Sequence, residues 1–468
     1  MPKQYIILPW DLKRWPDIKQ KLSLDINNVV DLDNTICSFN NKLRSRSIIE
    51  MFIKYQQECD EWTNSNSSAS DDKNTSSVHK FLPSTDEIIK KLIPFMKGLI
   101  LNGSKLFKNY PVKALVPQVK TNITLSRPQV ATIISCAFFN LFNYNYLTKG
   151  SFSIDIFPEL TFLNVYMNQN IFALQCLINY FNQVYGYMNH EDQNHRDIFD
   201  ASNIIIYRNV LNYMPEWGLS GKPLCEVALS EGNIDGSPAK LHVCFSSDYI
   251  CGNAFEGSLS PEEVTFLVRP ECMVSILLCA QMCKNESISI LGTEKMSDYS
   301  GYMSGVKYNG IFADDTMRGF SKDNTEVLIQ NIVIAIDATT RTSGVTQYIQ
   351  DFDRDLYKAY CGFSTFNFSH DGEPIATGNW GCGSYGGNNY LKFIQQLLAA
   401  SQANKSLIYH SNNKLFENKL IEFLHWLQKS NLSVGDLYMM YKKLIKKCYT
   451  GPYSRLSELD IFECLQDM

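Results

Sequence analysis

The sequence lacks three features that would assign it to a membrane, a secreted framework or a charge-driven nucleic-acid binder. No stretch of about 18 consecutive apolar residues occurs, which argues against a membrane-spanning helix. The first residues hold an apolar run too short for a signal peptide, and Asp11, Lys13 and Arg14 interrupt it. The 43 Lys and Arg residues are outnumbered by 48 Asp and Glu residues, which gives a net charge of −5. No basic field therefore favours nucleic acid, and we expect neither a membrane nor a sequence-specific nucleic-acid partner.

Paired cysteine motifs are also missing. The chain has 14 cysteines, scattered without CxxC pairs or a regular spacing. In a chain of this length without a secretory signal, such cysteines are typical of reduced thiols. We therefore expect a nuclear or cytoplasmic protein that is not secreted. The lysine-rich segment Lys442 to Lys447 is better interpreted as the solvated face of a helix than as a nuclear signal.

The first 200 or so residues favour helices. Ser84 to Glu87 and Ser126 to Gln129 both have the spacing of a capping box, in which two side chains satisfy the amides that open a helix. Pro94 should kink the first of these helices or end it early. The second, continuing to about Phe142, is apolar nearly all round and should be buried. Phe172 to Tyr187 predicts a further apolar helix.

After about residue 200 the pattern changes to short β-rich runs separated by apolar helical segments. The expected strands are Ile204 to Tyr207, Leu241 to Phe245, Ser287 to Leu291, Ile332 to Asp337 and Ser406 to His410. The expected helices are Cys272 to Cys283, Leu391 to Ala400 and Phe416 to Leu427. This alternation predicts an α/β fold, a sheet covered on its faces by helices. We expect a helical domain over residues 1–200, with a flexible Asn/Ser-rich insertion at about 64–77, and an α/β domain over residues 201–468.

The first candidate site is a pair of adjacent carboxylates, Glu262 and Glu263, which follows a short strand and a loop of small and polar residues. Two carboxyl groups beside such a loop suit acid-catalysed cleavage of a glycosidic bond. The run Ser260-Pro261-Glu262-Glu263 also fits a capped helix start with solvated acids in its first turn. The two interpretations are compatible, because a helix N-terminus at a cleft can hold a carboxylate in place.

The second candidate site is the segment Thr377 to Asn389, TGNWGCGSYGGNN. Its five glycines allow backbone amides to converge on a phosphate, and the dipole of a following helix favours an anion. The segment formally contains a GxGxxG motif, but no acidic residue follows about 20 positions later, as a dinucleotide site requires. A diphosphate cradle of another kind and an ordinary glycine-rich turn are the two interpretations that stay open.

The third candidate site is the segment Gly292 to Tyr302, GTEKMSDYSGY, directly after an expected strand. Loops at strand ends are where α/β folds place ligands. Tyr299 and Tyr302 offer flat faces for a purine, and the alternative is that both tyrosines are packing residues.

Together the three segments resemble the poly(ADP-ribose) glycohydrolase family over about residues 80 to 450. GTEKMSDYSGY is similar to the family's loop with the adenine-contacting tyrosine, here Tyr302. ATGNWGCGSYGG matches the family's diphosphate-binding loop nearly letter for letter. The family's catalytic signature is three glycines, a short spacer and Gln-Glu-Glu. It falls here on Cys251-Gly252-Asn253 and Pro261-Glu262-Glu263, with seven residues between them.

The resemblance implies a macrodomain-like three-layer α/β/α sandwich preceded by a helical accessory domain, with no metal and no organic cofactor. It implies hydrolysis of the ribose–ribose O-glycosidic bonds of poly(ADP-ribose), release of ADP-ribose and a place in the DNA damage response. Partners would be poly(ADP-ribose), ADP-ribose and ADP-ribosylated proteins. Glu263 corresponds to the general acid that then acts as a base towards water, and Glu262 to a carboxylate that positions the ribose. The implied substrate-binding residues are Gly252, Asn253, Ser247, Tyr302, Tyr299, Asn379, Gly381, Gly383, Ser384, Tyr385, Gly386 and His410.

Several residues depart from the family's pattern. Cys251 and Asn253 replace glycines, Pro261 replaces Gln, Cys244 replaces Asp, Ser247 replaces Asn, and His410 replaces a Phe that packs on adenine. If position 251 needs a left-handed backbone, a cysteine there costs roughly 1–2 kcal/mol. The alternative hypothesis is therefore a catalytically impaired pseudoenzyme that binds ADP-ribose or poly(ADP-ribose).

Overall fold

The computed structural model describes residues 4–40, 42–66, 82–108, 110–143, 147, 152–251, 259–312, 331–340, 349–364, 372–449 and 461–468. Most of the predicted insertion, residues 67–77, lies outside this part of the chain. Within it, no helix combines the length and the apolar character needed to cross a membrane.

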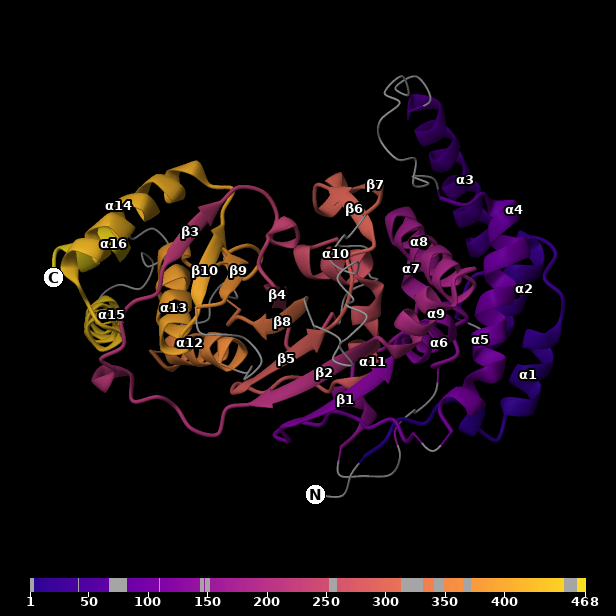
Figure 1. The fold of residues 1–468 in the computed structure, drawn as a ribbon, viewed down its shortest axis with the longest axis horizontal. Helices are drawn as coiled ribbons and strands as arrows, with labels where there is room; N and C mark the ends of the chain where they lie inside the picture. The colour runs from indigo at the N-terminus through magenta and orange to yellow at the C-terminus, as the bar shows by residue number, and fades with distance from the viewer. Residues whose placement is uncertain are drawn as a thin grey trace.

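The N-terminal part of the chain is mainly helical (Figure 1). Its elements are η1 (Pro9–Asp11), α1 (Trp15–Ser23), α2 (Val29–Phe39), α3 (Ser47–Asn66), α4 (Thr85–Glu87), η3 (Ile88–Leu92), α5 (Ile93–Leu106), β1 (Thr121–Ser126), α6 (Arg127–Phe138), η4 (Ile154–Ile156), α7 (Leu163–Met167), α8 (Ile171–Met188) and α9 (Gln193–Ala201). In Figure 1 these helices stack to the right of a central sheet, and the C-terminal helices lie to its left.

Both predicted capping boxes open helices. The Glu87 carboxylate accepts the Ser84 N–H at 2.8 Å at the start of α4, and the Gln129 side chain accepts the Ser126 N–H at 2.9 Å at the start of α6. Pro94 does not end its helix. It lies just after the π-helical turn η3, and the chain continues through it into α5.

The rest of the chain alternates strands and helices, as predicted. The strands are β2 (Asn203–Val210), β3 (Val227–Ser230), β4 (Leu241–Ser246), β5 (Glu286–Leu291), β6 (Ser297–Ser300), β7 (Lys307–Ile311), β8 (Ile332–Asp337), β9 (Pro374–Gly378) and β10 (Ser406–His410). The helical elements are η5 (Trp217–Leu219), η6 (Ile234–Gly236), α10 (Pro261–Val268), η7 (Pro270–Met273), α11 (Val274–Leu278), η8 (Met303–Gly305), α12 (Ile349–Phe363), α13 (Asn389–Gln402), α14 (Lys414–Ser430), α15 (Val434–Tyr449) and α16 (Ile461–Gln466).

One mixed sheet organises the fold. Among the described residues, its strand order is β1-β2-β5-β8-β4-β9-β10-β3. β1, β2, β5 and β8 pair antiparallel, and the strands from β8 to β3 pair parallel. β1 comes from the mainly helical N-terminal part and still joins this sheet, beside β2. A domain boundary at residue 200 stays a prediction.

Two apolar cores cover the two faces of the sheet. Along β8, Val333 and Ala335 pack into a core shared with α6, α8 and α10. Ile334 and Ile336, which alternate with them, pack into a second core with α12 and α13. This alternation is the period-2 pattern of a strand buried on both faces, and it makes a three-layer arrangement of helices, sheet and helices.

The helix predicted for Cys272 to Cys283 is wrong in extent. The chain forms the short turn η7 and α11, and the helix ends at Leu278. Leu278 then accepts the Leu115 N–H at 2.7 Å, and Ala280 donates to the Leu115 carbonyl at 3.1 Å. Pairing with a distant segment therefore draws this apolar run into an extended conformation that its own sequence does not signal.

Candidate active site

The candidate residues gather at one edge of the sheet. Because β8, β4, β9 and β10 are parallel, their carboxyl ends meet there, as in other α/β ligand sites. β4 and β9 pair only at their beginnings, where Leu241 and His242 face Ile375 and Ala376. Between β4 and β9 lies a cavity of about 350 Å³, here named the central cavity. Its walls include Cys244, Tyr302, Asn379 and His410.

The acidic pair opens helix α10 beside the central cavity, which Pro261 and Thr265 of the same helix also line. The carboxylate of Glu263 accepts the Ser260 N–H at 2.5 Å, so the predicted capped helix start is correct. The expectation of solvated acids is wrong, since Glu262 and Glu263 are only 9% and 4% exposed. The helix start therefore presents two desolvated carboxyl groups.

Three neutral donors hold Glu262. Its Oε1 accepts the Ser246 hydroxyl at 2.5 Å and the Cys251 N–H at 2.6 Å, and its Oε2 accepts the Ser247 N–H at 3.1 Å. Burial raises the pKa of Glu262 to about 7, although the three donors lower it. A carboxyl group with a pKa near the working pH can exchange a proton with a substrate.

Cys251 adopts the left-handed backbone considered for this position, with φ of +50°. For a residue with a Cβ this conformation costs roughly 1–2 kcal/mol. The thiol is buried, and its pKa is raised well above the usual value, mainly by burial and then by Glu262. In this conformation the Cys251 N–H reaches Glu262 and helps to fix its carboxyl group.

The two tyrosines of the third segment have different environments. Tyr299 is buried and donates its hydroxyl to Asp235 Oδ2 at 3.0 Å, while the hydroxyls of Tyr299 and Tyr302 lie 3.0 Å apart. Their rings meet edge to face, with centroids 5.8 Å apart. Tyr302 borders the central cavity, whereas Tyr299 is not among the cavity's described lining residues. Tyr299 therefore positions Tyr302, so the packing interpretation describes Tyr299 better.

Asn379 and His410 line the central cavity from the ends of β9 and β10. The Asn379 side chain accepts the Tyr409 hydroxyl at 3.0 Å and donates to the Ser411 hydroxyl at 3.4 Å, which fixes its orientation. Burial lowers the pKa of His410 below its usual value, so its ring is neutral at pH 7.

The glycine-rich segment is a compact loop between β9 and α13. Gly381 and Gly386 have φ of +71° and +65°, and a Cβ on Gly381 would lie 2.5 Å from the Ala338 Cβ. The loop is closed by a bond of 2.9 Å from the Gly387 N–H to the Gly381 carbonyl. Only glycine satisfies both the conformation and the space at position 381. Both interpretations of the segment, a diphosphate cradle and a glycine-rich turn, are compatible with this geometry.

The tip of the loop is open to solvent. Gly383, Ser384 and Gly386 are exposed, and Tyr385 is partly buried. The pKa of Tyr385 is raised to about 12 by burial and then by nearby carboxylates, Glu262 first among them. Tyr385 therefore lies within electrostatic reach of the catalytic candidates.

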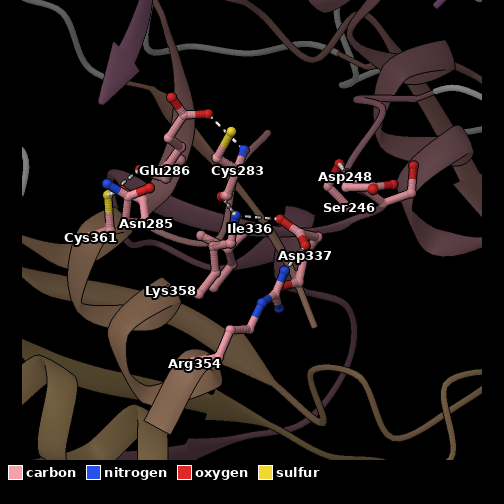
Figure 2. Close-up of polar contacts among 12 residues, drawn as sticks. Ser246, Asp248, Cys283, Asn285, Glu286, Ile336, Asp337, Arg354, Lys358 and Cys361 are labelled. Atoms are coloured by element: carbon pink, nitrogen blue, oxygen red, sulfur yellow. Dashed lines mark hydrogen bonds and ion pairs between the residues drawn. The ribbon is translucent and has the colours of Figure 1, made fainter. Parts of the chain in front are cut away.

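Beneath the loop lies a buried group of charges that the sequence did not point out, here named the cation cluster: Asp337, Arg354, Asp355, Lys358 and Lys392. Figure 2 shows Arg354 and Lys358 of α12 reaching Asp337 at the end of β8. The Lys358 ammonium lies 2.6 Å from Asp337 Oδ1, and Arg354 contacts Oδ2.

Asp355 links α12 to α13 within this cluster. Its Oδ1 accepts the Thr339 N–H and hydroxyl, both at 2.9 Å, and an Arg354 N–H at 2.9 Å, while Lys392 contacts its Oδ2. The cations Lys392 and Arg354 keep the pKa of Asp355 below its usual value despite burial. Asp355 thus stays ionised.

The structure brings Tyr302, Asn379 and His410 to the central cavity, and Ser247 to Glu262. Gly252 and Asn253 lie outside the described residues. No group of three or more His, Cys, Asp or Glu side chains in the described part of the chain is arranged to hold a metal ion. The absence of a metal and of an organic cofactor stays a prediction.

Two protein-family models match the chain. Residues 83–198 match the model described as "Poly (ADP-ribose) glycohydrolase (PARG), helical domain", and residues 214–418 match "Poly (ADP-ribose) glycohydrolase (PARG), Macro domain fold". The predicted architecture, a helical domain followed by a macrodomain-like sandwich, is therefore confirmed.

Curated relatives are similar at low identity. The protein named "Probable poly(ADP-ribose) glycohydrolase 2" from Arabidopsis thaliana is 26% identical over 394 residues, covering 72% of this chain and 71% of that protein. "Poly(ADP-ribose) glycohydrolase 1" from the same organism is 23% identical, covering 78% of this chain and 80% of that protein. "Poly(ADP-ribose) glycohydrolase 1" from Caenorhabditis elegans is 29% identical, covering 44% of this chain and 28% of that protein.

Proposed function

Because the chain belongs to the poly(ADP-ribose) glycohydrolase family, we propose that it hydrolyses ribose–ribose O-glycosidic bonds in poly(ADP-ribose) and releases ADP-ribose. The observation that carries the proposal is the acidic pair. Glu262 and Glu263 are desolvated carboxyl groups at the start of a helix whose side chains line the central cavity. Desolvation raises the proton affinity of a carboxyl group, which is what protonation of a leaving hydroxyl requires.

In the proposed reaction Glu263 protonates the ribose hydroxyl that leaves as the glycosidic bond breaks. It then accepts a proton from the water that attacks the oxocarbenium-like centre. Glu262 positions the ribose beside it. The three donors that fix Glu262 allow no rotation without the loss of a hydrogen bond, so the ribose meets a preorganised carboxyl group.

The remaining contacts follow the layout of the sheet edge. The adenine lies in the central cavity between Tyr302 and His410, with Asn379 at its side, and Tyr299 supports Tyr302. The diphosphate meets the loop amides from Gly381 to Gly386, with Ser384 and Tyr385 beside the ribose. Ser247, Gly252 and Asn253 complete the ribose and phosphate contacts in this proposal. ADP-ribosylated proteins, a role in DNA repair and a nuclear or cytoplasmic location stay predictions.

A second candidate function is binding without turnover. It is favoured by the contacts of Glu262, whose two oxygens already accept three hydrogen bonds from the protein, and by the strained Cys251 at a family glycine position. A protein of this kind would recognise ADP-ribose or polymer ends without cleaving the polymer.

The test is release of ADP-ribose from purified poly(ADP-ribose) by the wild-type chain, Glu263→Gln and Glu262→Gln. Loss of a general acid lowers turnover by about 10²–10⁴-fold, so Glu263→Gln should abolish detectable release. The Glu262→Gln variant is the matched control, because the pKa of Glu262 near 7 makes it a rival proton donor. Full release by Glu263→Gln with loss only in Glu262→Gln would reverse the two roles. No release by the wild type, with ADP-ribose still bound, would establish the binding function.

A further inference from the structure

We infer that Lys392 is a positioning residue for the diphosphate of ADP-ribose, and that it acts through the excess positive charge of the buried cation cluster. This inference rests on the proposed function. Because Lys392 is only 3% exposed, it acts from beneath the loop amides and not by direct contact with the diphosphate.

Lys392 lies under both ends of the glycine-rich loop. A Cβ on Gly381 would lie 3.5 Å from the Lys392 ammonium nitrogen, and a Cβ on Gly387 would lie 3.1 Å from the Lys392 Cε. The ammonium also lies 4.5 Å from the centre of the Trp380 ring, which is fully buried and bonds the Ile336 carbonyl at 3.0 Å. The Lys392 side chain thus occupies space beside Gly381 and Gly387 that a Cβ at either position would crowd.

The cluster has more cations than anions. Arg354, Lys358 and Lys392 face only two carboxylates, Asp337 and Asp355. The nearby Glu286 does not correct the imbalance, because it pairs with Arg208 at 2.5 Å. All five side chains of the cluster are at most 15% exposed. The excess charge therefore acts in a medium less screening than water.

This excess charge has the sign that a diphosphate requires. The first amides of α13 also direct their partial positive charge towards the loop, with Asn388 capping the helix at 3.0 Å from the Leu391 nitrogen. Helix dipole and cation cluster therefore add at the same loop. We expect the affinity for a diphosphate ligand to follow the net charge of the cluster.

A charge series tests this expectation. Lys392→Met removes the excess, the double variant Lys392→Met/Asp355→Asn restores it, and Asp355→Asn increases it. By calorimetry at low salt, Lys392→Met should bind ADP-ribose at least about tenfold more weakly, and the double variant within about threefold of the wild type. Asp355→Asn should bind no more weakly than the wild type. Adenosine, which has no phosphate, should show no such order.

Thermal unfolding of the same variants separates an effect of cluster charge on ADP-ribose affinity from an effect of lost stability. Both variants that lack Lys392 lose its ion pair and its packing on Trp380, so both should unfold earlier than the wild type. ADP-ribose affinities that follow unfolding temperature, and not cluster charge, would overturn the inference. If Lys392→Met does not fold, Asp355→Asn still tests the inference. This variant increases the excess positive charge, so weaker ADP-ribose binding by it would contradict the expected dependence on charge. A wild type that binds no ADP-ribose would instead refute the proposed function.

Discussion

Two buried carboxyl groups at the same edge of the sheet have opposite properties. Glu262 is 9% exposed and Asp355 is 3% exposed, so both are removed from water. Glu262 meets three neutral donors, and its pKa rises to about 7, mainly through burial. Asp355 meets Lys392 and Arg354, and its pKa falls. Partner charge, and not burial alone, therefore decides which carboxyl group can hold a proton at neutral pH.

The difference separates two tasks at one site. A carboxyl group without a cationic partner is costly to ionise, and this cost is what a proton donor needs. A paired carboxylate keeps two cations buried beneath the glycine-rich loop, where we propose that their charge attracts an anion. Glu262 should therefore lower stability in return for reactivity, whereas removal of Asp355 should cost stability.

The largest expected effect on stability concerns Asp355→Ala. This change leaves Lys392 and Arg354 buried with fewer partners, and breaking such a buried pair costs about 3–5 kcal/mol. Urea unfolding at pH 7 measures the loss. The matched control is Asp353→Ala on the same helix, whose partner Lys442 is partly exposed, and this pair should be worth at most about 1 kcal/mol. Equal losses of unfolding free energy in the two variants would contradict the expected difference between the buried ion pairs of Asp355 and the partly exposed pair of Asp353.

The next effect is the pH dependence of stability caused by Glu262. Its folded-state pKa of about 7 exceeds the ordinary value of 4.5. Relative to Glu262→Gln, the wild type should therefore lose stability as pH rises from 4.5 to 7, by about 3 kcal/mol in total, and no further above that. Unfolding free energies of both proteins, measured every half unit, give the difference. The pH-independent part of this difference reflects the replacement of the carboxyl group by an amide, so only its change with pH tests the pKa. A difference that is the same at every pH would contradict the raised pKa of Glu262.

A smaller effect is expected for the contact between the Tyr302 ring and the adenine of ADP-ribose. Loss of ring stacking in Tyr302→Ala should weaken ADP-ribose binding by about 1–3 kcal/mol. Tyr299→Phe is the control, because it keeps the neighbouring ring and removes only the hydroxyl that holds Tyr302. We expect it to weaken binding less than Tyr302→Ala does. Unchanged affinity in Tyr302→Ala, measured by calorimetry, would place the adenine elsewhere.

Of the parallel strands, the sequence predicted β4, β8 and β10, but it did not predict β3 and β9. β8 and β10 have the expected bounds. For β8 the reason is that a strand buried on both faces is almost continuously hydrophobic. The acidic pair and the glycine-rich loop could be found because their residues are adjacent in the chain. The burial of Glu263 could not, since it depends on packing that a capped helix start does not encode.

The cation cluster was missed because its members are far apart in the sequence. Asp337 ends a strand, Arg354 and Lys358 belong to α12, and Lys392 belongs to α13. One signal was present: Asp337 closes an otherwise apolar buried strand, and a charge in that position needs a partner. Which partner it finds depends on the crossing of α12 over the sheet, and this is a property of the fold.

The most direct test of the division of tasks compares Glu263→Gln with Lys392→Met in two measurements on each: ADP-ribose affinity, and the rate of polymer cleavage with enzyme in saturating excess. We predict that Glu263→Gln lowers the cleavage rate by about 10²–10⁴-fold and leaves ADP-ribose affinity within about threefold of the wild type. For Lys392→Met we predict an ADP-ribose affinity at least about tenfold lower, with a saturated cleavage rate within about threefold of the wild type. If Lys392→Met loses its saturated rate and keeps its affinity, the two regions do not have the separate roles assigned to them.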